Sequence, residues 1–421
     1  MIETKPEIGR RLEIVVESIA PSGKGKGRAR DMSPKFSFFV EGTVPGDRVL
    51  AEVTGGKKRY FEADLIELRE VGPDRVAPPC PHYEDCGGCQ LQHLDYQAQL
   101  EAKRDVLRYH LKRLGFGDVD VPPLVASPNP LRYRVRSSLD LLPGGSLGMA
   151  RRRSRDLVEI RSCHQMHAAL ESGLFQAAVK FAERYPRGRV KIVGVLDSTE
   201  PRRVFCHPYV DAREMHAPSD WFLLDSRSLR AAGDALCRYE AFGLDLRYAP
   251  DCFTQVNPSL NEKLVGYAVE RLAPSRSTRV LELYAGIGNF TLPVARHAKR
   301  VTAVEWARGA SFLTENARRN GLSNVTVIGG DAVTTLGSLA RKKQQFEAVL
   351  LDPPREGLGP RGVDLLGALG PRRIVYVSCE PKSLLADVAR LNGFRYRLAS
   401  VQAFDMFPQT FHLETVAVLE R

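Results

Sequence analysis

The carboxyl-terminal part of the sequence most narrows the possible folds, because apolar runs alternate there with helical stretches. From about residue 250 the chain contains RVLELYAG, RVTAVEWA, NVTVIGGD, FEAVLLDPP and RRIVYVSCE, with helical segments between them. Such alternation is typical of a parallel sheet covered by helices on both faces. Two further runs, YRLASVQAFDMF and HLETVAVLER, are close enough to pair as an antiparallel hairpin at the sheet edge. We therefore expect an α/β domain over residues 249–421.

Residues 10 to about 70 predict a different architecture, because apolar and polar residues alternate there with the period of strands. Leu12 and Ile14 belong to the first run, and Phe36 and Phe38 to the second. Glycines separate the runs, which indicates a small closed or partly closed β-barrel of the oligonucleotide-binding type over residues 1–72. Basic residues crowd its turns, as at positions 24–30.

Residues 73–248 are expected to form a central α+β domain after a proline-rich joint at 72–81. Residues 91–114 have the apolar spacing of a helix, and strand-like pieces follow near 131–142, 146–150 and 156–162. Further helices are expected near 165–184 and 226–238. The segment 131–161 is rich in arginine, so we expect it to contact phosphates. The sequence of residues 185–240 does not indicate their role.

The charge balance favours a polyanionic partner. The chain has a net charge of +11 and a pI near 9.3, which for a chain of this size suggests nucleic acid. No window holds the roughly 20 consecutive apolar residues of a membrane helix, and the first residues lack the pattern of a signal peptide. We therefore expect a cytoplasmic protein without a membrane partner.

Eight cysteines in such a chain should stay reduced, so a cluster of them indicates a metal site or a catalytic thiol. Cys80, Cys86 and Cys89 have ligand spacing, and Cys163 is the best candidate for a fourth ligand. Four thiolates fit either zinc or an iron–sulfur cluster, and the spacing does not decide between them. The remaining cysteines at 206, 237 and 252 are expected to be packing residues.

Glycines mark the first turn of the α/β domain as a ligand site. Gly286 and Gly288 lie where the first strand turns into a helix, and their lack of a side chain lets a ligand approach the backbone. Two kinds of fold bind a ligand there, a nicotinamide-binding fold and an S-adenosylmethionine (SAM) methyltransferase. Thr291 stands where the dinucleotide fingerprint has its third glycine, which favours a methyltransferase.

Three carboxylates follow the next three strands of the same domain. Glu305 would accept hydrogen bonds from ribose hydroxyls, and Asp331 would suit an adenine amino group. Asp352, in Asp-Pro-Pro, would shape the reacting end of the pocket.

Cys379 is the candidate nucleophile, because it follows the fifth strand just before a helix expected to start at Pro381. A helix N-terminus favours thiolate over thiol. C5 of uracil is too poor a nucleophile to accept a methyl group unaided, but thiolate attack at C6 makes an enolate that can. A base must then remove the C5 proton. Glu414 on the final strand is our candidate base, with His412 as the rival, which we rank as a substrate or structural contact.

Taken together, these motifs resemble those of bacterial RNA uridine-5-methyltransferases, in particular the 23S ribosomal RNA branch with an N-terminal TRAM domain and a [4Fe-4S] cluster. The resemblance runs essentially end to end. Its most specific pieces are Cys80-x5-Cys86-Gly-Gly-Cys89-Gln-Leu-Gln-His with Cys163, Phe253-Thr-Gln255-Val-Asn257, Tyr284-Ala-Gly286-Ile-Gly288-Asn289-Phe290, Asp352-Pro-Pro-Arg-Glu-Gly, Ser378-Cys379 and His412-Leu-Glu414.

The resemblance implies a role for each of these residues. A class I, Rossmann-like SAM-dependent methyltransferase domain would follow the TRAM barrel and an iron–sulfur domain. Cys379 would be the nucleophile and Glu414 the proton acceptor. The cluster ligands would be Cys80, Cys86, Cys89 and Cys163, and the SAM site would comprise Gln255, Tyr284, Gly286, Gly288, Asn289, Glu305, Asp331 and Asp352.

The implied activity is methylation of C5 of a uridine in 23S ribosomal RNA, by an enzyme that extrudes the base from folded RNA. We expect a monomer with RNA and not DNA as its partner. A transfer RNA uridine-5-methyltransferase is the alternative, and the choice of ribosomal RNA depends on the barrel and cysteine cluster by resemblance.

Three other classes fit the residues less well. Amino-group methyltransferases have an aromatic residue after Asp/Asn-Pro-Pro, where this chain has Arg355. Radical methylthiotransferases have a Cys-x3-Cys-x2-Cys spacing that is absent here. A non-catalytic RNA-binding or assembly factor would be expected to have lost Cys379 or Glu414, and both are present.

Overall fold

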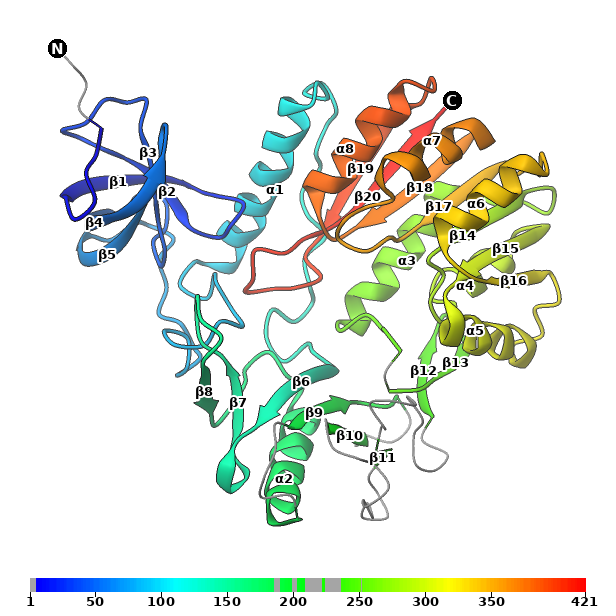
Figure 1. The fold of residues 1–421 in the computed structure, drawn as a ribbon, viewed down its shortest axis with the longest axis horizontal. Coiled ribbons are helices and arrows are strands. Elements are labelled where there is room, and N and C mark those ends of the chain that lie inside the picture. The colour runs from blue at the N-terminus through cyan, green and yellow to red at the C-terminus, as the bar shows by residue number, and fades with distance from the viewer. Residues whose placement is uncertain (1–4, 185–189, 199–202, 209–221, 224–235, 251) are drawn as a thin grey trace. The chain divides into compact units, whose positions relative to one another are not determined.

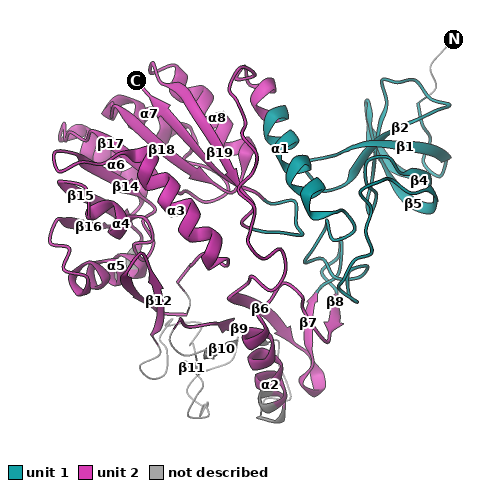
Figure 2. Cartoon of the chain, turned by 180° about the vertical axis from the view of Figure 1, so that it is seen from behind, with its two compact units in different colours: residues 1–109, 150–156, 407–412 teal, residues 110–149, 157–406, 413–421 magenta. Residues whose placement is uncertain are grey.

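The computed structural model describes residues 5–184, 190–198, 203–208, 222–223, 236–250 and 252–421, which fall into two compact units (Figure 2). Unit 1 comprises Met1–Tyr109, Ala150–Asp156 and Phe407–His412, and unit 2 comprises His110–Met149, Leu157–Met406 and Leu413–Arg421. Each unit has its own sheets and apolar core. In the described part of the chain no helix is both long and apolar enough to span a membrane. The division into domains at 1–72, 73–248 and 249–421 stays a prediction.

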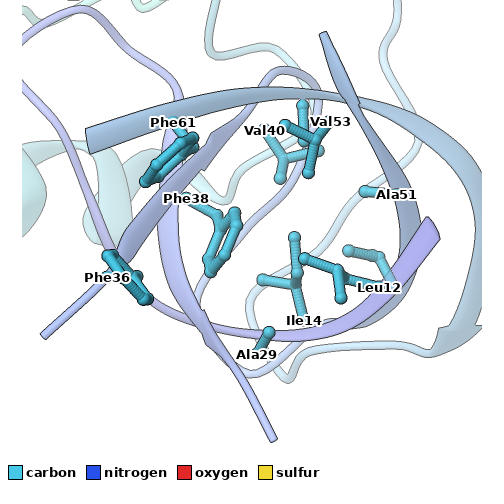
Figure 3. Packing of buried hydrophobic residues seen from close by; sticks show 11 residues of the cluster. Leu12, Ile14, Ala29, Phe36, Phe38, Val40, Ala51, Val53 and Phe61 are labelled. Atoms are coloured by element: carbon cyan, nitrogen blue, oxygen red, sulfur yellow. The ribbon is translucent and has the colours of Figure 1, made fainter. Parts of the chain in front are cut away.

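A closed five-stranded barrel forms the core of unit 1, as the alternating pattern predicted. Its strands follow the order β1-β2-β3-β5-β4 around the barrel, with bounds β1 Arg11–Ile19, β2 Gly25–Ala29, β3 Ser37–Val40, β4 Arg48–Lys57 and β5 Tyr60–Glu70. Inward-facing side chains fill the interior, with Ile14, Phe38 and Val40 fully buried (Figure 3). Closure pairs every strand, so the barrel presents no unpaired sheet edge.

Helix α1 runs from Tyr96 to Arg113, so the prediction of a helix from residue 91 was wrong at its start. The Asp95 side chain accepts a hydrogen bond from the backbone N–H of Gln97 at 2.9 Å, which gives a partner to one of the N–H groups that the first turn of a helix leaves unpaired. Leu91 and Leu94 precede the helix and pack with Ile19 and Val44. Their apolar spacing reflects burial in a loop, which periodicity cannot separate from burial on a helix.

The first sheet of unit 2 has six strands, consistent with the expected α+β region. Its order is β11-β10-β9-β6-β7-β8, with bounds β6 Arg136–Leu141, β7 Leu147–Ala150, β8 Leu157–Ile160, β9 Val190–Val195, β10 Arg203–Pro208 and β11 Phe222–Leu223. A 3-10 turn, Pro143–Gly145, joins β6 to β7, and helix α2, Ala168–Arg184, packs on the sheet through Leu170 and Leu174. The helix predicted near 226–238 lies outside the described residues up to 235, and strand β12 already begins at Cys237.

The second large sheet of unit 2 has seven strands in the order β16-β15-β14-β17-β18-β20-β19 (Figure 1). The strands are β14 Arg279–Leu283, β15 Arg300–Glu305, β16 Val325–Gly329, β17 Ala348–Leu351, β18 Arg373–Ser378, β19 Arg397–Phe404 and β20 Glu414–Glu420. The helices are α3 Pro258–Leu272, α4 Thr291–Ala295, α5 Ala307–Arg319, α6 Ala332–Arg341, α7 Gly359–Leu369 and α8 Pro381–Asn392. Strands β14 to β18 are parallel, and β20 pairs antiparallel with both β18 and β19. Both the parallel sheet and the antiparallel hairpin at its edge are confirmed.

A separate hairpin, β12 Cys237–Ala241 with β13 Leu244–Tyr248, is attached to helix α5 by two asparagines. The Asn316 amide accepts from Arg247 N at 2.8 Å and donates to Arg247 O at 3.0 Å. Asn320 does the same with Asp245, at 3.0 and 2.8 Å. Because the two asparagines are four residues apart, they share one face of the helix and pair with the free edge of β13.

We expect Phe38→Ala to destabilise the barrel by about 3–5 kcal/mol, because it empties a fully buried site. Phe39→Ala is the matched control, since the neighbouring side chain points to the other face and is only partly buried. Hydrogen exchange of peptides from residues 11–70 measures the local stability. Equal protection in the two variants would contradict the packing described here.

Candidate active site

The register of the seven-stranded sheet brings the carboxyl ends of its parallel strands to one edge. Leu283 of β14 lies opposite Leu351 of β17 and beside Val304 of β15, so the residues that follow these strands share that edge. Ser378 of β18 lies opposite Thr415 of β20. Cys379 and Glu414 are therefore the next positions along that same antiparallel pair, as expected from their places in the sequence.

The Cys379 thiol is half-buried among charged groups. Burial is the main cause that raises its pKa to about 11, and the negative charges of Glu414 and Asp352 raise it further. Arg355 acts in the opposite direction, through its charge and a hydrogen bond to the sulfur. The prediction that this position favours the thiolate was therefore wrong for the protein without substrate.

The expected helix does begin at Pro381, but another group uses its N-terminus. The side chain of Glu380 accepts a hydrogen bond from Lys382 N at 3.3 Å and caps helix α8. This carboxylate takes up a free amide that would otherwise favour an anion at the neighbouring sulfur. The helix therefore has one fewer free amide to stabilise a thiolate at Cys379.

The two carboxyl groups near Cys379 hold their protons unusually tightly. Glu414 is almost fully buried, and burial together with the charge of Asp352 raises its pKa well above the ordinary value. Burial raises the pKa of Asp352 to about 7. Asp352 can therefore bind and release a proton near neutral pH, beside a Glu414 carboxyl group that favours its protonated form.

A cavity opens at the same edge, beside the β12–β13 hairpin. Five of the eight residues expected at the cofactor site line it: Gln255, Tyr284, Gly286, Asn289 and Asp352. Phe253, Tyr239 and Asn261 also line it, although no cofactor role was predicted for them.

The turn after β14 has the backbone that a close ligand approach requires. Tyr284 has a φ of +61°, which is unusual for a residue with a side chain and costs conformational energy. A Cβ at Gly286 would meet nothing within 4 Å, so open space lies there. At Gly288 it would come within 2.1 Å of the Leu292 side chain. Gly286 thus leaves room for a ligand, whereas Gly288 is required by packing.

Glu305 supports this turn from the neighbouring strand. Its carboxylate accepts hydrogen bonds from Gly286 N at 2.7 Å and from Trp306 N at 2.8 Å. Asp331 instead caps helix α6 by accepting from Thr334 N at 2.7 Å, and this bond is the main cause that lowers its pKa. Gly288, Glu305 and Asp331 do not line the cavity, and their proposed cofactor roles stay predictions.

Two further features of this edge suit a polar ligand. Asn289 and Asn261 exchange reciprocal amide hydrogen bonds of 3.0 and 2.8 Å, and Asn261 also donates to the Tyr239 hydroxyl at 3.1 Å. The side-chain oxygen of Gln255 is buried with no hydrogen-bond partner among the described residues. A ligand with hydroxyl or ammonium donors would satisfy this acceptor.

Among the positions at this edge that were not assigned from the sequence, Arg355, Glu282 and Tyr239 differ in the signal that could have identified them. Arg355 lies three residues after Asp352 in the motif already recognised, so the motif itself pointed to it. Glu282 is fully buried, and burial raises its pKa to about 8. In the sequence, however, nothing distinguishes it from any other residue of a buried strand. Tyr239 comes from a segment that carried no recognisable signal.

Three of the four predicted cluster ligands lie in unit 1. Gly88 N donates to Cys86 Sγ at 3.4 Å, and Arg152 donates to the carbonyls of Tyr83 and Cys89 at 2.6 and 2.8 Å. In the described ranges, no three His, Cys, Asp or Glu side chains are close enough to hold one metal ion. None of the four predicted ligands forms a disulfide, and an iron–sulfur cluster takes one thiolate on each iron instead of four on a single ion. The chemistry of the donor set fits such a cluster.

The fourth candidate ligand, Cys163, lies in unit 2, where its N–H donates to the Glu171 carboxylate at 2.6 Å. The rival base His412 lies in unit 1, with its ring 4.3 Å from that of Phe411.

Several arginines of the segment 131–161 bind protein groups. Arg132 pairs with Glu171 in unit 2, and in unit 1 Arg152 and Arg153 both pair with Glu41. Because these arginines already pair with protein carboxylates, fewer arginines of this segment are available to contact phosphates than its composition suggests.

Comparison with known proteins identifies relatives over the whole chain. The family described as tRNA (uracil-5-)-methyltransferase matches residues 241–421. The 23S rRNA (uracil(1939)-C(5))-methyltransferase RlmD of Alkalilimnicola ehrlichii is 33% identical, over 97% of this chain and 96% of its own length. That of Marinomonas sp. is 32% identical over 99% and 97%.

A solved structure is similar over nearly the same extent. The tRNA (uracil-54, C5)-methyltransferase of Pyrococcus abyssi, in complex with S-adenosyl-L-homocysteine, superposes with a TM-score of 0.75 at 25% identity. The match covers 97% of this chain and all of that chain.

The charges around Cys379 predict opposite effects of two substitutions on its alkylation. Asp352→Asn removes a negative neighbour, so we expect the pH midpoint of iodoacetamide reaction to fall from about 11. Arg355→Gln removes a positive neighbour and should raise the midpoint. Mass spectrometry of the Cys379 peptide separates this thiol from the other cysteines. Equal midpoints in both variants would contradict the electrostatic arrangement.

Proposed function

The chain belongs to the family of SAM-dependent RNA uracil-5-methyltransferases, and we propose that it methylates C5 of a uridine in 23S ribosomal RNA. Relatives that carry this activity in their names align with it from end to end at 32–33% identity. The similar transfer RNA enzyme is 25% identical, so transfer RNA is the second candidate substrate.

The observation that carries the proposal is the placement of one thiol and two carboxyl groups at the cofactor edge, where Cys379 and Glu414 are next to the paired residues Ser378 and Thr415 and Asp352 follows strand β17. The charges of Glu414 and Asp352 act on Cys379, and Asp352 also lines the cavity. This arrangement supports the roles of Cys379 as nucleophile and of Glu414 as base.

The proposed reaction starts with the Cys379 sulfur. Its thiolate bonds to C6 of uracil, and the electron pair of the C5–C6 double bond moves to make an enolate with a nucleophilic C5. Because the thiol has a pKa of about 11, it has to pass its proton to solvent as the uracil enters the site. Arg355, the neighbouring cation that favours the thiolate, would stabilise the anion during this step.

Glu414 completes the reaction. SAM supplies the methyl group as an electrophile bound to sulfur. The methyl–sulfur bond would break as the methyl–C5 bond forms, which would leave S-adenosyl-L-homocysteine. Because burial raises the pKa of Glu414, its carboxyl group has to lose its proton to solvent before the next step. The C5 proton then passes to the Glu414 carboxylate, and the C5–C6 double bond re-forms as the Cys379–C6 bond breaks. A carboxylate whose pKa is raised by burial is a better proton acceptor than an exposed one.

The proposed SAM site comprises Gln255, Tyr284, Gly286, Gly288, Asn289, Glu305, Asp331 and Asp352. The open space at Gly286 supports it because a ligand has room there, and the unpartnered oxygen of Gln255 supports it because it calls for a ligand with hydrogen-bond donors. Binding by these residues would orient the donor toward the edge that holds Cys379.

The remaining parts of the chain would serve RNA binding and cluster binding. We assign a TRAM-type RNA-binding barrel to residues 1–72, an iron–sulfur domain to 73–248 and the methyltransferase domain to 249–421. Cys80, Cys86, Cys89 and Cys163 would hold a [4Fe-4S] cluster with a structural role. We further propose a cytoplasmic monomer, in keeping with the ribosomal RNA substrate in the names of its relatives.

Methyl transfer from labelled SAM tests the function. We expect incorporation into 23S ribosomal RNA fragments and little into transfer RNA, with at least a thousandfold loss in Cys379→Ala, since a covalent step cannot proceed without its nucleophile. Full activity of the alanine variant would overturn the covalent mechanism. Preference for transfer RNA would support the second candidate substrate.

Glu414→Gln should accumulate a covalent protein–RNA adduct, because the methylated intermediate could not lose its C5 proton. Denaturing gel electrophoresis with labelled RNA detects the adduct. The double variant with Cys379→Ala is the control and should form none. If the single variant turns over freely, another group is the base.

The proposed cluster predicts broad visible absorbance in anaerobically purified protein. We expect Cys86→Ser to reduce it strongly, whereas Cys237→Ser, at a buried packing residue, should keep it. Stoichiometric zinc without visible absorbance would replace the iron–sulfur assignment.

A further inference from the structure

The seven-stranded sheet separates charge between its two edges. The loops that leave its strands at the catalytic edge carry seven acidic residues and one arginine, within 284–290, 305–306, 329–331, 352–358, 378–380, 404–405 and 413–414. The segments at the opposite, amino edge carry twelve Arg and Lys and two glutamates, within 274–279, 297–300, 321–324, 341–347, 370–373, 393–397 and 420–421. The whole chain has a net charge of only +11, so this edge is a strong local concentration of positive charge.

Strand register places the cations of this amino edge in one row. Arg279 lies opposite Arg300, and Glu420 lies opposite both Arg373 and Arg397. All twelve cations except Arg373 are exposed. The row therefore crosses the sheet from β15 to β19 with more cations than carboxylates, which are Glu347 and Glu420.

A hollow of about 540 Å³ lies within this row. Four arginines and two glutamates line it: Arg372, Arg373, Arg397, Arg421, Glu347 and Glu420. Glu420 pairs with Arg373 and Arg397 at 2.9 Å each, and Glu347 pairs with Arg279 at 2.6 Å. Two carboxylates are thus shared among more cations than they can neutralise, which leaves the hollow positive.

Helix ends account for little of this charge. Cations are favourable at helix C-termini, and α3, α5 and α8 have Arg271, Arg318 with Arg319, and Arg390 in their last turns. None of these four belongs to the segments of the amino edge, and Arg341 of α6 does. Exposed like charges in a row repel one another, so a polyanion that neutralises them would bind favourably.

We propose that the amino edge of the sheet binds the phosphate backbone of a ribosomal RNA segment that lies away from the target uridine. This inference rests on the proposed RNA substrate and extends it. Even without Asp352 and Glu414, whose pKa values burial raises, the catalytic edge carries five acidic residues and one arginine, so backbone affinity has to come from other surfaces. A substrate long enough to reach past the edge that holds the reacting base can occupy this one.

The test removes three exposed charges, Lys299→Gln, Arg300→Gln and Arg372→Gln, none of which belongs to the proposed catalytic site. The control variant, Lys263→Gln, Arg318→Gln and Arg319→Gln, removes the same charge elsewhere on unit 2. Fluorescence anisotropy measures binding to a short stem-loop with the target uridine and to a several-fold longer 23S fragment, across a salt series.

We expect the test variant to bind the long fragment roughly tenfold more weakly at about 0.1 M salt, with a salt slope smaller by about 0.7–0.9 for each phosphate that the variant no longer neutralises. Binding and methylation of the stem-loop should match the wild type, which also shows that the variant is folded. Equal weakening in test and control variants, or no weakening in either, would overturn the inference. Failure of the wild-type protein to methylate any RNA would instead overturn the proposed function.

Discussion

The parallel register of β14, β15, β17 and β18 is the constraint on which the site depends, because it ends four strands at one edge. A polar residue lies at the end of each strand, where the surrounding apolar side chains exclude water. The carboxyl groups of Asp352 and Glu414 therefore keep their protons to higher pH, and the same burial suppresses ionisation of the Cys379 thiol. The reaction at this edge therefore depends on how a bound substrate changes the pKa values of these three groups.

Sequence reasoning recovered the features that have a fixed period or a fixed motif. The alternation of residues 10–70 identified the barrel, and the buried runs after residue 250 identified the parallel sheet with its antiparallel edge. Five of the expected cofactor residues line the cavity, because strand ends in such a sheet have predictable positions.

The errors and omissions have physical causes that one-dimensional patterns do not show. Leu91 and Leu94 are buried from a loop, so their spacing imitated a helix. The pKa of Cys379 depends on its burial and on two carboxyl groups, of Glu414 and Asp352, that are far away in sequence. Whether Gly286 faces open space and Gly288 faces Leu292 could be learned only from the packed structure.

The asparagine pair on α5 has a consequence for motion at the cavity. Tyr239 stands on the β12–β13 hairpin, and Asn316 and Asn320 join β13 to the helix through four amide hydrogen bonds. The same hairpin also buries Leu244, Leu246 and Tyr248 in one apolar cluster with Ala303 of β15. Opening this wall of the cavity would therefore cost more than exchanging four bonds for water, because it would also expose part of a core that the sheet shares.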